Sequence, residues 1–412
     1  MTRQWAGLVA LSILLGAASA AAVVCWRPAI EPAPAPPIAS FSPAKIAAGA
    51  RLAALGDCAT CHAGTDGQAY AGGAAIQTPF GAIHATNITP DLETGIGSWS
   101  FDAFRRAMVE GVARDGSHLY PAFPYPHFAG MGDEDIAALY AFFMTRAPVH
   151  AAAQPNHLGF PFGLRPLLAG WKLLYMPGKP FCPDPSRRVA WNRGAYLVKT
   201  IGHCGACHTP RNALGAERSK LALSGGEVEG WDAPPLTAAS TAPEPWTEAQ
   251  LFTYLRTGFE PRHGAAAGPM APVVAELAPV PDDDLRSMAT YLASMMSTAA
   301  PVAPHAAGHP SAVAATVFAG ACASCHGADA QEVRVPLALS TILAAPQPND
   351  AVRILLAGLQ PPSGRAGPFM PGFADVLTDE QITGLLLYLR EEVSGRPEWS
   401  DVAETLQAAR RP

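Results

Sequence analysis

Two cysteines and a histidine recur in the same close spacing at three places in this sequence of 412 residues. Each copy reads C-x-x-C-H, the attachment pattern of c-type haem, in which both thiols bond to the porphyrin and the histidine binds the iron. A lone C-x-x-C pair is also compatible with a zinc site or a thioredoxin-like redox pair. Three copies, each followed at once by histidine, instead predict three covalently bound haem c groups. The residues are Cys58, Cys61 and His62, Cys204, Cys207 and His208, and Cys322, Cys325 and His326.

Composition limits the class of protein and its compartment. The net charge of -6 and the isoelectric point of about 6.0 give no reason to expect nucleic acid as a partner. The length predicts about two to four domains. Covalent haem attachment places the chain in an exported, periplasm-like compartment. Cys25 and Cys182 lie outside the motifs, and a disulfide between them is not expected because Cys25 sits in an apolar run.

The N-terminal segment, 1–27, is expected to be a membrane anchor or a signal peptide. Residues 5–26 carry no charge and are long enough to span a bilayer. A cleaved signal peptide would use Ala18-Ser19-Ala20 as its cleavage site. The apolar run continues past that site through Val24, which favours a retained anchor. Both interpretations put the body of the chain outside the cytoplasm, separated from the membrane by the Pro/Ala-rich spacer 28–42.

A common plan surrounds the three motifs. A short helix pattern precedes each motif, and a helix with an aromatic residue and an acidic beginning closes each segment. Gly49 and Gly194 on the first two opening helices would let the closing helices cross at close range. This pairing resembles the class I cytochrome c domain, so we expect an all-α chain of three tandem domains. The opening helices are expected at 44–55, 192–202 and 312–321, and the closing helices at 133–146, 282–296 and 379–392.

These patterns also set the expected domain boundaries. The connector contains an apolar run, 163–175, that includes Arg165, Trp171 and Lys172. Two interpretations of this run stay open: a segment packed between domains, or a helix lying at the membrane interface or against a partner. The expected boundaries are 43–150 for the first domain, 151–185 for the connector, 186–300 for the second domain, 301–310 for a linker, 311–395 for the third domain and 396–412 for a polar tail.

The loop before each closing helix should supply the second axial ligand of the iron. A haem that only passes electrons is usually six-coordinate, often with methionine opposite the histidine. Met370 is the candidate in the third domain and Met270 in the second. The first domain offers His127, with Met131 as the alternative, and a histidine there would lower the potential of that haem. The remaining methionines near these sites fall on helical patterns and are read as core: Met108, Met144, Met288, Met295 and Met296.

With these residues in view, the chain resembles the three-haem cytochrome c subunit of bacterial membrane-bound dehydrogenases. One departure concerns the first haem. Members that serve alcohol dehydrogenases carry methionine as the distal ligand in a Tyr-Pro-Ala-Met-Pro-Tyr run, where this chain has Phe123. A phenyl ring cannot bind iron, so the ligand must come from elsewhere. The resemblance rests on residues 78–81, 86–91, 94–97, 116–125, 202–211 and 268–273.

The resemblance implies an electron-transfer subunit with no catalytic residues of its own. Such a subunit accepts electrons from a partner dehydrogenase at the periplasmic side of the inner membrane and passes them to quinone or a terminal oxidase. The apolar N-terminus and residues 26–30 and 169–174 look like the subgroup that serves molybdenum hydroxylases of the nicotinate or isoquinoline type. A PQQ- or flavin-dependent alcohol, aldehyde or gluconate dehydrogenase is the alternative partner. Two rival classes are a stand-alone haem enzyme such as a peroxidase, with an open first iron, and a subunit of a terminal oxidase.

Overall fold

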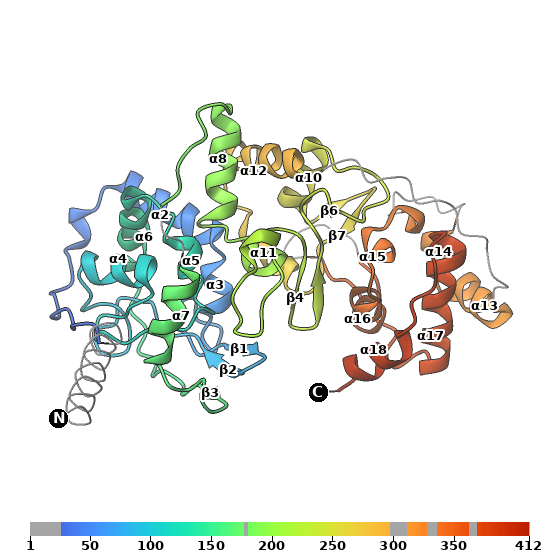
Figure 1. The fold of residues 1–412 in the computed structure, drawn as a ribbon, viewed down its shortest axis with the longest axis horizontal. Coiled ribbons are helices and arrows are strands. Elements are labelled where there is room, and N and C mark those ends of the chain that lie inside the picture. Colours follow the sequence, from blue (N-terminus) through green and yellow to red (C-terminus); the bar gives the residue numbers. More distant parts are fainter. Residues whose placement is uncertain (1–25, 177–179, 297–310, 328–335, 362–368, 412) are drawn as a thin grey trace, which may run out of the picture. The chain divides into compact units, whose positions relative to one another are not determined.

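Two compact units make up the described part of the chain. The first unit runs to Cys182 and also includes the short segment Lys199–His203, and the second comprises Pro183–Val198 and Cys204 onward. The expected anchor or signal segment, apart from its last two residues, and the expected linker 301–310 lie outside the described residues. The computed structural model describes residues 26–176, 180–296, 311–327, 336–361 and 369–411 (Figure 1).

Helices dominate both units. The first unit contains η1 (Ile38–Ser40), α2 (Pro43–Leu55), α3 (Cys58–Cys61), α4 (Phe101–Glu110), α5 (Tyr125–Phe128), α6 (Asp133–Met144) and α7 (Leu167–Tyr175). Apart from the last residue of α8, the second unit contains α8 (Val189–Lys199), α9 (Gly205–His208), η2 (Ser219–Leu221), α10 (Glu248–Thr257), α11 (Met270–Glu276), α12 (Asp282–Met295), α13 (Ala312–Ala321), α14 (Ala323–His326), η3 (Leu337–Leu339), α15 (Thr341–Ala344), α16 (Asn349–Ala357), α17 (Asp379–Tyr388), η4 (Leu389–Val393) and α18 (Val402–Ala409). Among the described residues, none of these helices has both the length and the apolar composition needed to cross a bilayer.

Small antiparallel sheets correct the expectation of a purely helical chain. They form where the backbone must run extended beside the motifs, and short hairpins satisfy its hydrogen bonds there. The sheet of the first unit is β1–β2–β3, and the described part of the second unit holds the pairs β4–β5 and β6–β7. Their bounds are β1 Ala75–Thr78, β2 Gly81–His84, β3 His157–Leu158, β4 Gly226–Val228, β5 Trp231–Ala233, β6 Phe259–Glu260 and β7 Gly264–Ala265.

A close crossing of two helices recurs beside each motif, as the glycine pattern predicted. Gly49 of α2 lies against the backbone of Ala138 in α6, and Gly194 of α8 lies against Ser287 in α12. In the third pair, α13 and α17, the small residues are Ala314 and Gly384. Small side chains at the crossing let the two helices approach, so the helix before the motif is fixed against the helix that closes the segment.

The expected helix ends shift by a few residues. The second opening helix ends at Lys199 rather than 202, because the chain turns toward the motif with His203 at φ 35°. The third closing helix ends as α17 at Tyr388 and continues as the wider turn η4. Thr378 begins α17 with a capping box to Gln381, in which each side chain bonds to the other residue's backbone N–H.

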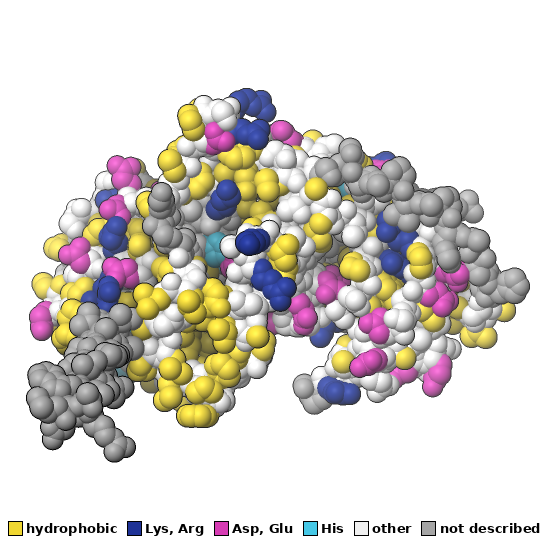
Figure 2. All heavy atoms as spheres, viewed as in Figure 1, with side chains coloured by type: hydrophobic (Ala, Val, Ile, Leu, Met, Phe, Trp, Pro, Cys, Tyr) yellow, Lys and Arg dark blue, Asp and Glu magenta, His cyan; other side chains and the backbone are white. Residues whose placement is uncertain are grey.

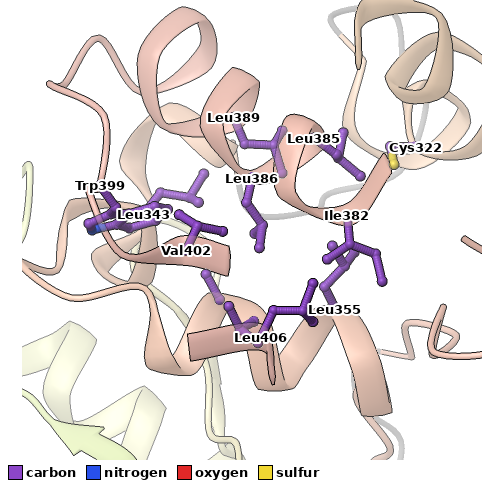
Figure 3. Close-up of a cluster of buried hydrophobic side chains, with 12 residues drawn as sticks. Cys322, Leu343, Leu355, Ile382, Leu385, Leu386, Leu389, Trp399, Val402 and Leu406 are labelled. Atoms are coloured by element: carbon purple, nitrogen blue, oxygen red, sulfur yellow. The ribbon is translucent and has the colours of Figure 1, made fainter. Parts of the chain in front are cut away.

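The C-terminal residues belong to the third core, which corrects their interpretation as a polar tail. Trp399, Val402 and Leu406 are buried in one apolar cluster with Cys322 and residues of α16 and α17 (Figure 3). The polar residues of α18 face outward while Val402 and Leu406 face inward, so composition alone hides the buried face. α18 therefore packs into the same apolar cluster as Cys322 of the third motif.

A polar contact joins β5 to the beginning of α16 inside the second unit. The backbone N–H of Asp232 donates to Asp350 Oδ1 at 2.8 Å, and Asn349 Nδ2 donates to Asp232 Oδ1 at 3.0 Å. Arg353 Nε donates to the carbonyl of Gly230 at 2.7 Å. Removal from water raises the pKa of both carboxyl groups, that of Asp350 to about 6.

Candidate haem sites

Each C-x-x-C-H motif occupies a single helical turn directly after its opening helix. These turns are α3, α9 and α14. The residue before the first motif, Asp57, has φ 48°, and the residue before the second, His203, has φ 35°. Positive φ is unusual for residues other than glycine, and here it redirects the chain from the opening helix into the motif. The same local geometry therefore presents the cysteines and the histidine at both places.

The motif histidines of the first two sites are oriented by backbone carbonyl groups. His62 Nδ1 lies 2.6 Å from the carbonyl oxygen of Thr86, and His208 Nδ1 lies 2.7 Å from that of Pro234. A carbonyl oxygen only accepts, so Nδ1 carries the hydrogen and donates it. This tautomer leaves the Nε2 lone pair for a metal, the arrangement usual for ligating histidines. Burial lowers the pKa of both imidazoles, which keeps them neutral, as iron ligation requires.

The motif thiols differ in their exposure: Cys322 is buried, Cys61 is exposed, and the other four are half-buried. Burial and the neighbouring Cys207 raise the pKa of Cys204 to about 12, and burial together with Cys325 raises the pKa of Cys322. Cys204 in turn contributes to raising the pKa of Tyr291, on the closing helix α12, to about 12. The aromatic residue predicted for this closing helix therefore lies near the motif.

The proposed axial methionine of the third site lies on an extended loop. Met370 forms an isolated antiparallel bridge with Leu359, with backbone bonds of 2.9 and 3.0 Å. Its side chain packs against the apolar cluster that contains Cys322. Gly358, at φ +75°, lies so close to this strand that a side chain there would meet the backbone of Met370. One haem bonded at Cys322 would thus be within the same cluster as the thioether.

The proposed axial methionine of the second site begins a helix rather than lying within a loop. Met270 is the first residue of α11, after Pro269. Gly268 has φ +51°, and a Cβ atom there would collide with the indole ring of Trp231. The glycine therefore allows the chain to pass over the Trp231 ring just before the methionine. Sequence reasoning did not single out Trp231.

The first site has two candidates with different surroundings. His127 is in the one-turn helix α5, and its Nδ1 lies 2.9 Å from the carbonyl oxygen of Lys199. Met131 is buried, 5% exposed, in the turn between α5 and α6. Phe123 packs its ring against those of Tyr125 and Phe128, so it fills an aromatic cluster.

The methionines read as core from the sequence divide into two groups. Met108 of α4, Met144 of α6 and Met288 of α12 are buried, as expected. Met295 and Met296 are only half-buried at the end of α12. The residue types of Thr86 and Pro234 do not indicate that their backbone carbonyls accept from the motif histidines. Thr86 nevertheless lies in one of the runs that carried the family resemblance.

The donor set fits haem c. Each site combines two thiols on one turn with an adjacent histidine, and the two described Nδ1 bonds leave the opposite nitrogen for iron. Helix pairs that cross beside such turns are typical of cytochrome c domains. The family model named Cytochrome c matches residues 46–147 and 311–392.

Comparison with known proteins shows which kind of cytochrome c the chain resembles. Over 98% of its length the chain is 45% identical to a nicotinate dehydrogenase subunit of Pseudomonas putida, and it spans about a third of that protein, 35%. It is 37% identical to the fructose dehydrogenase cytochrome subunit of Gluconobacter japonicus, over 87% of this chain and 80% of that one. It is 36% identical to the gluconate 2-dehydrogenase cytochrome c subunit of Pantoea cypripedii, over 84% and 85%. The chain belongs to the family of dehydrogenase cytochrome c subunits, which transfer electrons and are not the catalytic subunits.

Proposed function

We propose that the chain binds three haem c groups, one at each motif, and carries electrons from a partner dehydrogenase to quinone or a terminal oxidase at the periplasmic side of the inner membrane. The observation that supports it is the recurrence of one local plan: an opening helix, a C-x-x-C-H turn and a crossing helix, at all three motifs. Bound haem supplies the one-electron chemistry. The chain supplies ligands, orientation and a low-dielectric surrounding.

The residues of the chain have distinct roles in this proposal. His62, His208 and His326 would hold the three irons, and carbonyl groups orient the rings of His62 and His208 so that Nε2 is left for the metal. Met370 and Met270 would hold the third and second irons through their thioethers, and a thioether ligand raises the potential of a haem. His127 is the proposed ligand of the first iron because its Nδ1, like those of His62 and His208, is bonded to a carbonyl oxygen. Met131 is the alternative.

A molybdenum hydroxylase is the favoured partner. The support is the likeness to the nicotinate dehydrogenase subunit, which extends over nearly the whole chain and at higher identity than the likeness to the fructose and gluconate dehydrogenase subunits. A PQQ- or flavin-dependent dehydrogenase of alcohols, aldehydes or gluconate is the alternative partner.

Haem counting tests the cofactor part of the proposal. Intact-mass spectrometry of the purified chain should show three haem additions. The double substitution Cys322→Ala with Cys325→Ala should remove one, and the matched change at Cys204 and Cys207 should remove a different one. A wild-type chain with two haems, or a motif variant that keeps three, would contradict the assignment.

Affinity capture from detergent-solubilised native membranes tests the partner. The tag should follow a flexible linker, because α18 ends close to the C-terminus and forms part of the core. Co-purified molybdenum would support the hydroxylase partner, whereas PQQ or flavin would move the assignment to the other dehydrogenases. A chain that oxidises substrates with no partner would contradict an electron-transfer subunit.

A further inference from the structure

The side of α7 that faces away from the rest of the protein is apolar. Leu167, Leu173 and Leu174 are 54%, 73% and 71% exposed. Leu167 and Leu174 are seven residues apart and lie on the same side of the helix, and Leu173 lies beside Leu174. The loop before α7 adds three exposed residues, of which Phe160 is 90% exposed. Hydrophobic side chains gather over this part of the first unit in Figure 2. We name this surface the α7 apolar face, and it comprises Phe160, Phe162, Leu164, Leu167, Leu173 and Leu174.

The cation of α7 points inward. The Nζ atom of Lys172 donates to the carbonyl oxygens of Glu110 and Gly111 at 2.8 and 2.6 Å and lies 3.0 Å from His118 Nδ1. Burial, with the nearby Arg27 guanidinium, lowers the pKa of Lys172 to about 7. A surface helix in water normally has leucine inside and lysine outside. The reversed arrangement is favourable where the outer side of the helix does not face water.

The loop beside α7 is held firmly to the first unit. Gly159 N–H donates to the Phe80 carbonyl at 3.0 Å, and the Tyr120 hydroxyl donates to the Gly163 carbonyl at 3.2 Å. Arg165 Nη1 donates to the carbonyl oxygen of His118 at 2.8 Å. The first two bonds fix the loop so that its phenyl rings stay exposed. The third bond turns a second cation, the Arg165 guanidinium, inward.

The chain that follows the apolar N-terminal run is fixed at the same place. Arg27 forms an ion pair with Glu110, whose carbonyl oxygen also receives Lys172. Ile30 N–H donates to the carbonyl oxygen of Arg114 at 2.8 Å. Trp26, at the end of the uncharged run 5–26, is 71% exposed. Tryptophan beside an apolar segment is typical of the membrane–water interface. The run therefore joins the first unit next to the residues that hold α7.

We propose that the α7 apolar face lies in the membrane surface, with α7 parallel to the bilayer and its six apolar side chains among the headgroups and upper acyl chains. Lipid is the occupant because the uncharged run ends at Trp26, directly before the Arg27 that pairs with Glu110 on the inner side of α7, and because Lys172 and Arg165 are both turned away from the face. An amphipathic helix binds a bilayer through such a buried apolar side. The inference rests on the proposed membrane location and identifies the surface that contacts lipid.

Photocrosslinking in native membranes tests this surface with the full haem-loaded chain. Leu174→p-benzoylphenylalanine and Phe160→p-benzoylphenylalanine would report on the α7 apolar face. Leu92→p-benzoylphenylalanine and Ile38→p-benzoylphenylalanine are matched controls, because these residues are 64% and 62% exposed but lie elsewhere on the first unit. Haem absorbance would confirm that each variant folds. We expect several-fold more lipid adducts, identified by mass spectrometry, from positions 174 and 160 than from positions 92 and 38.

The possible outcomes distinguish a failure of this inference from a failure of the proposed membrane location. If positions 174 and 160 attach to a protein, or give no more lipid adducts than the controls while the chain remains in the membrane fraction, the α7 apolar face does not contact lipid. If wild-type chain is absent from the membrane fraction after gentle lysis, the proposed membrane location itself fails and this inference fails with it.

Discussion

Gly49 in α2 lies beneath the carbonyl group of Ala138 in α6, so close that a Cβ atom at position 49 would come well under 3.0 Å from its oxygen. Gly194 has the same relation to the carbonyl group of Ser287. In both pairs the missing side chain sets the distance between the helix that leads into the motif and the helix that closes over it. The turn that carries the motif is therefore positioned by a residue that lies outside the motif.

Gly49→Ala should destabilise the first unit. The added methyl group has no space unless the two helices separate, and overpacking of this kind costs about 1–3 kcal/mol. Urea unfolding followed by haem absorbance would measure the change. Gly320→Ala in α13 is the matched control, since nothing lies within 4 Å of its Cβ position. There alanine should be neutral or stabilise by up to about 1 kcal/mol. Equal stability of Gly49→Ala and wild type would show that the crossing can relax freely.

Met370→Ala should lower the potential of the third haem or leave its iron with an open site. A thioether ligand raises the potential, and alanine cannot replace it. Spectroelectrochemical titration with carbon monoxide binding to the reduced protein would measure both effects. Met108→Ala is the control, because this buried methionine of α4 is a core residue. It should cost about 2–5 kcal/mol of stability without moving the potential of the third haem. An unchanged potential in Met370→Ala would remove the ligand assignment.

His127→Ala and Met131→Ala should separate the two candidates for the first iron. We expect His127→Ala to change the spectrum of the first haem alone. Met131→Ala should then reduce stability, because its side chain is buried, without changing the ligand field. Low-temperature electron paramagnetic resonance distinguishes bis-histidine from histidine–methionine coordination. The opposite pattern would assign Met131.

Asp350→Asn should change how stability depends on pH. The pKa of Asp350 is raised from 3.8 to about 6, because burial, helped by the negative charge of Asp232, outweighs the hydrogen bond from the Asp232 backbone N–H and the positive charge of Arg353. Between about pH 4 and pH 6 the folded chain keeps a proton that the unfolded chain has lost, so this group makes stability fall as pH rises through that window. Asparagine removes this fall. Asp375→Asn, at an exposed carboxyl group of the same unit, is the matched control for the loss of one negative charge.

The sequence was sufficient wherever chemistry depends on residue type and spacing. The motif positions, the paired helices and their glycines at 49 and 194 all follow from patterns that only a few structures satisfy. The axial candidates were found because methionine beside proline and glycine is conspicuous. The identity of the ligand to the first iron stays a prediction, because Phe123 removes the position that the resemblance would supply.

Other features could not be predicted because they depend on tertiary contacts. A carbonyl oxygen such as that of Thr86 has the same chemistry in every residue, so nothing in the sequence marks it as the acceptor for His62. The α18 segment was read as a tail because its polar residues outnumber the few that are buried. The inward direction of the Lys172 side chain could not be predicted either, because the sequence does not distinguish a buried lysine from a solvent-exposed one.

The burial of Leu406 beside the cluster that holds Cys322 has a consequence for maturation. If the chain is exported with its N-terminus first, as the proposed periplasmic location implies, Cys322 and Cys325 enter the new compartment about eighty residues before Leu406. During that interval the third core lacks one of its walls, so the motif stays accessible to the machinery that attaches haem. α18 would then close the third core around the attached cofactor, so haem attachment at Cys322 and Cys325 would precede the docking of this helix.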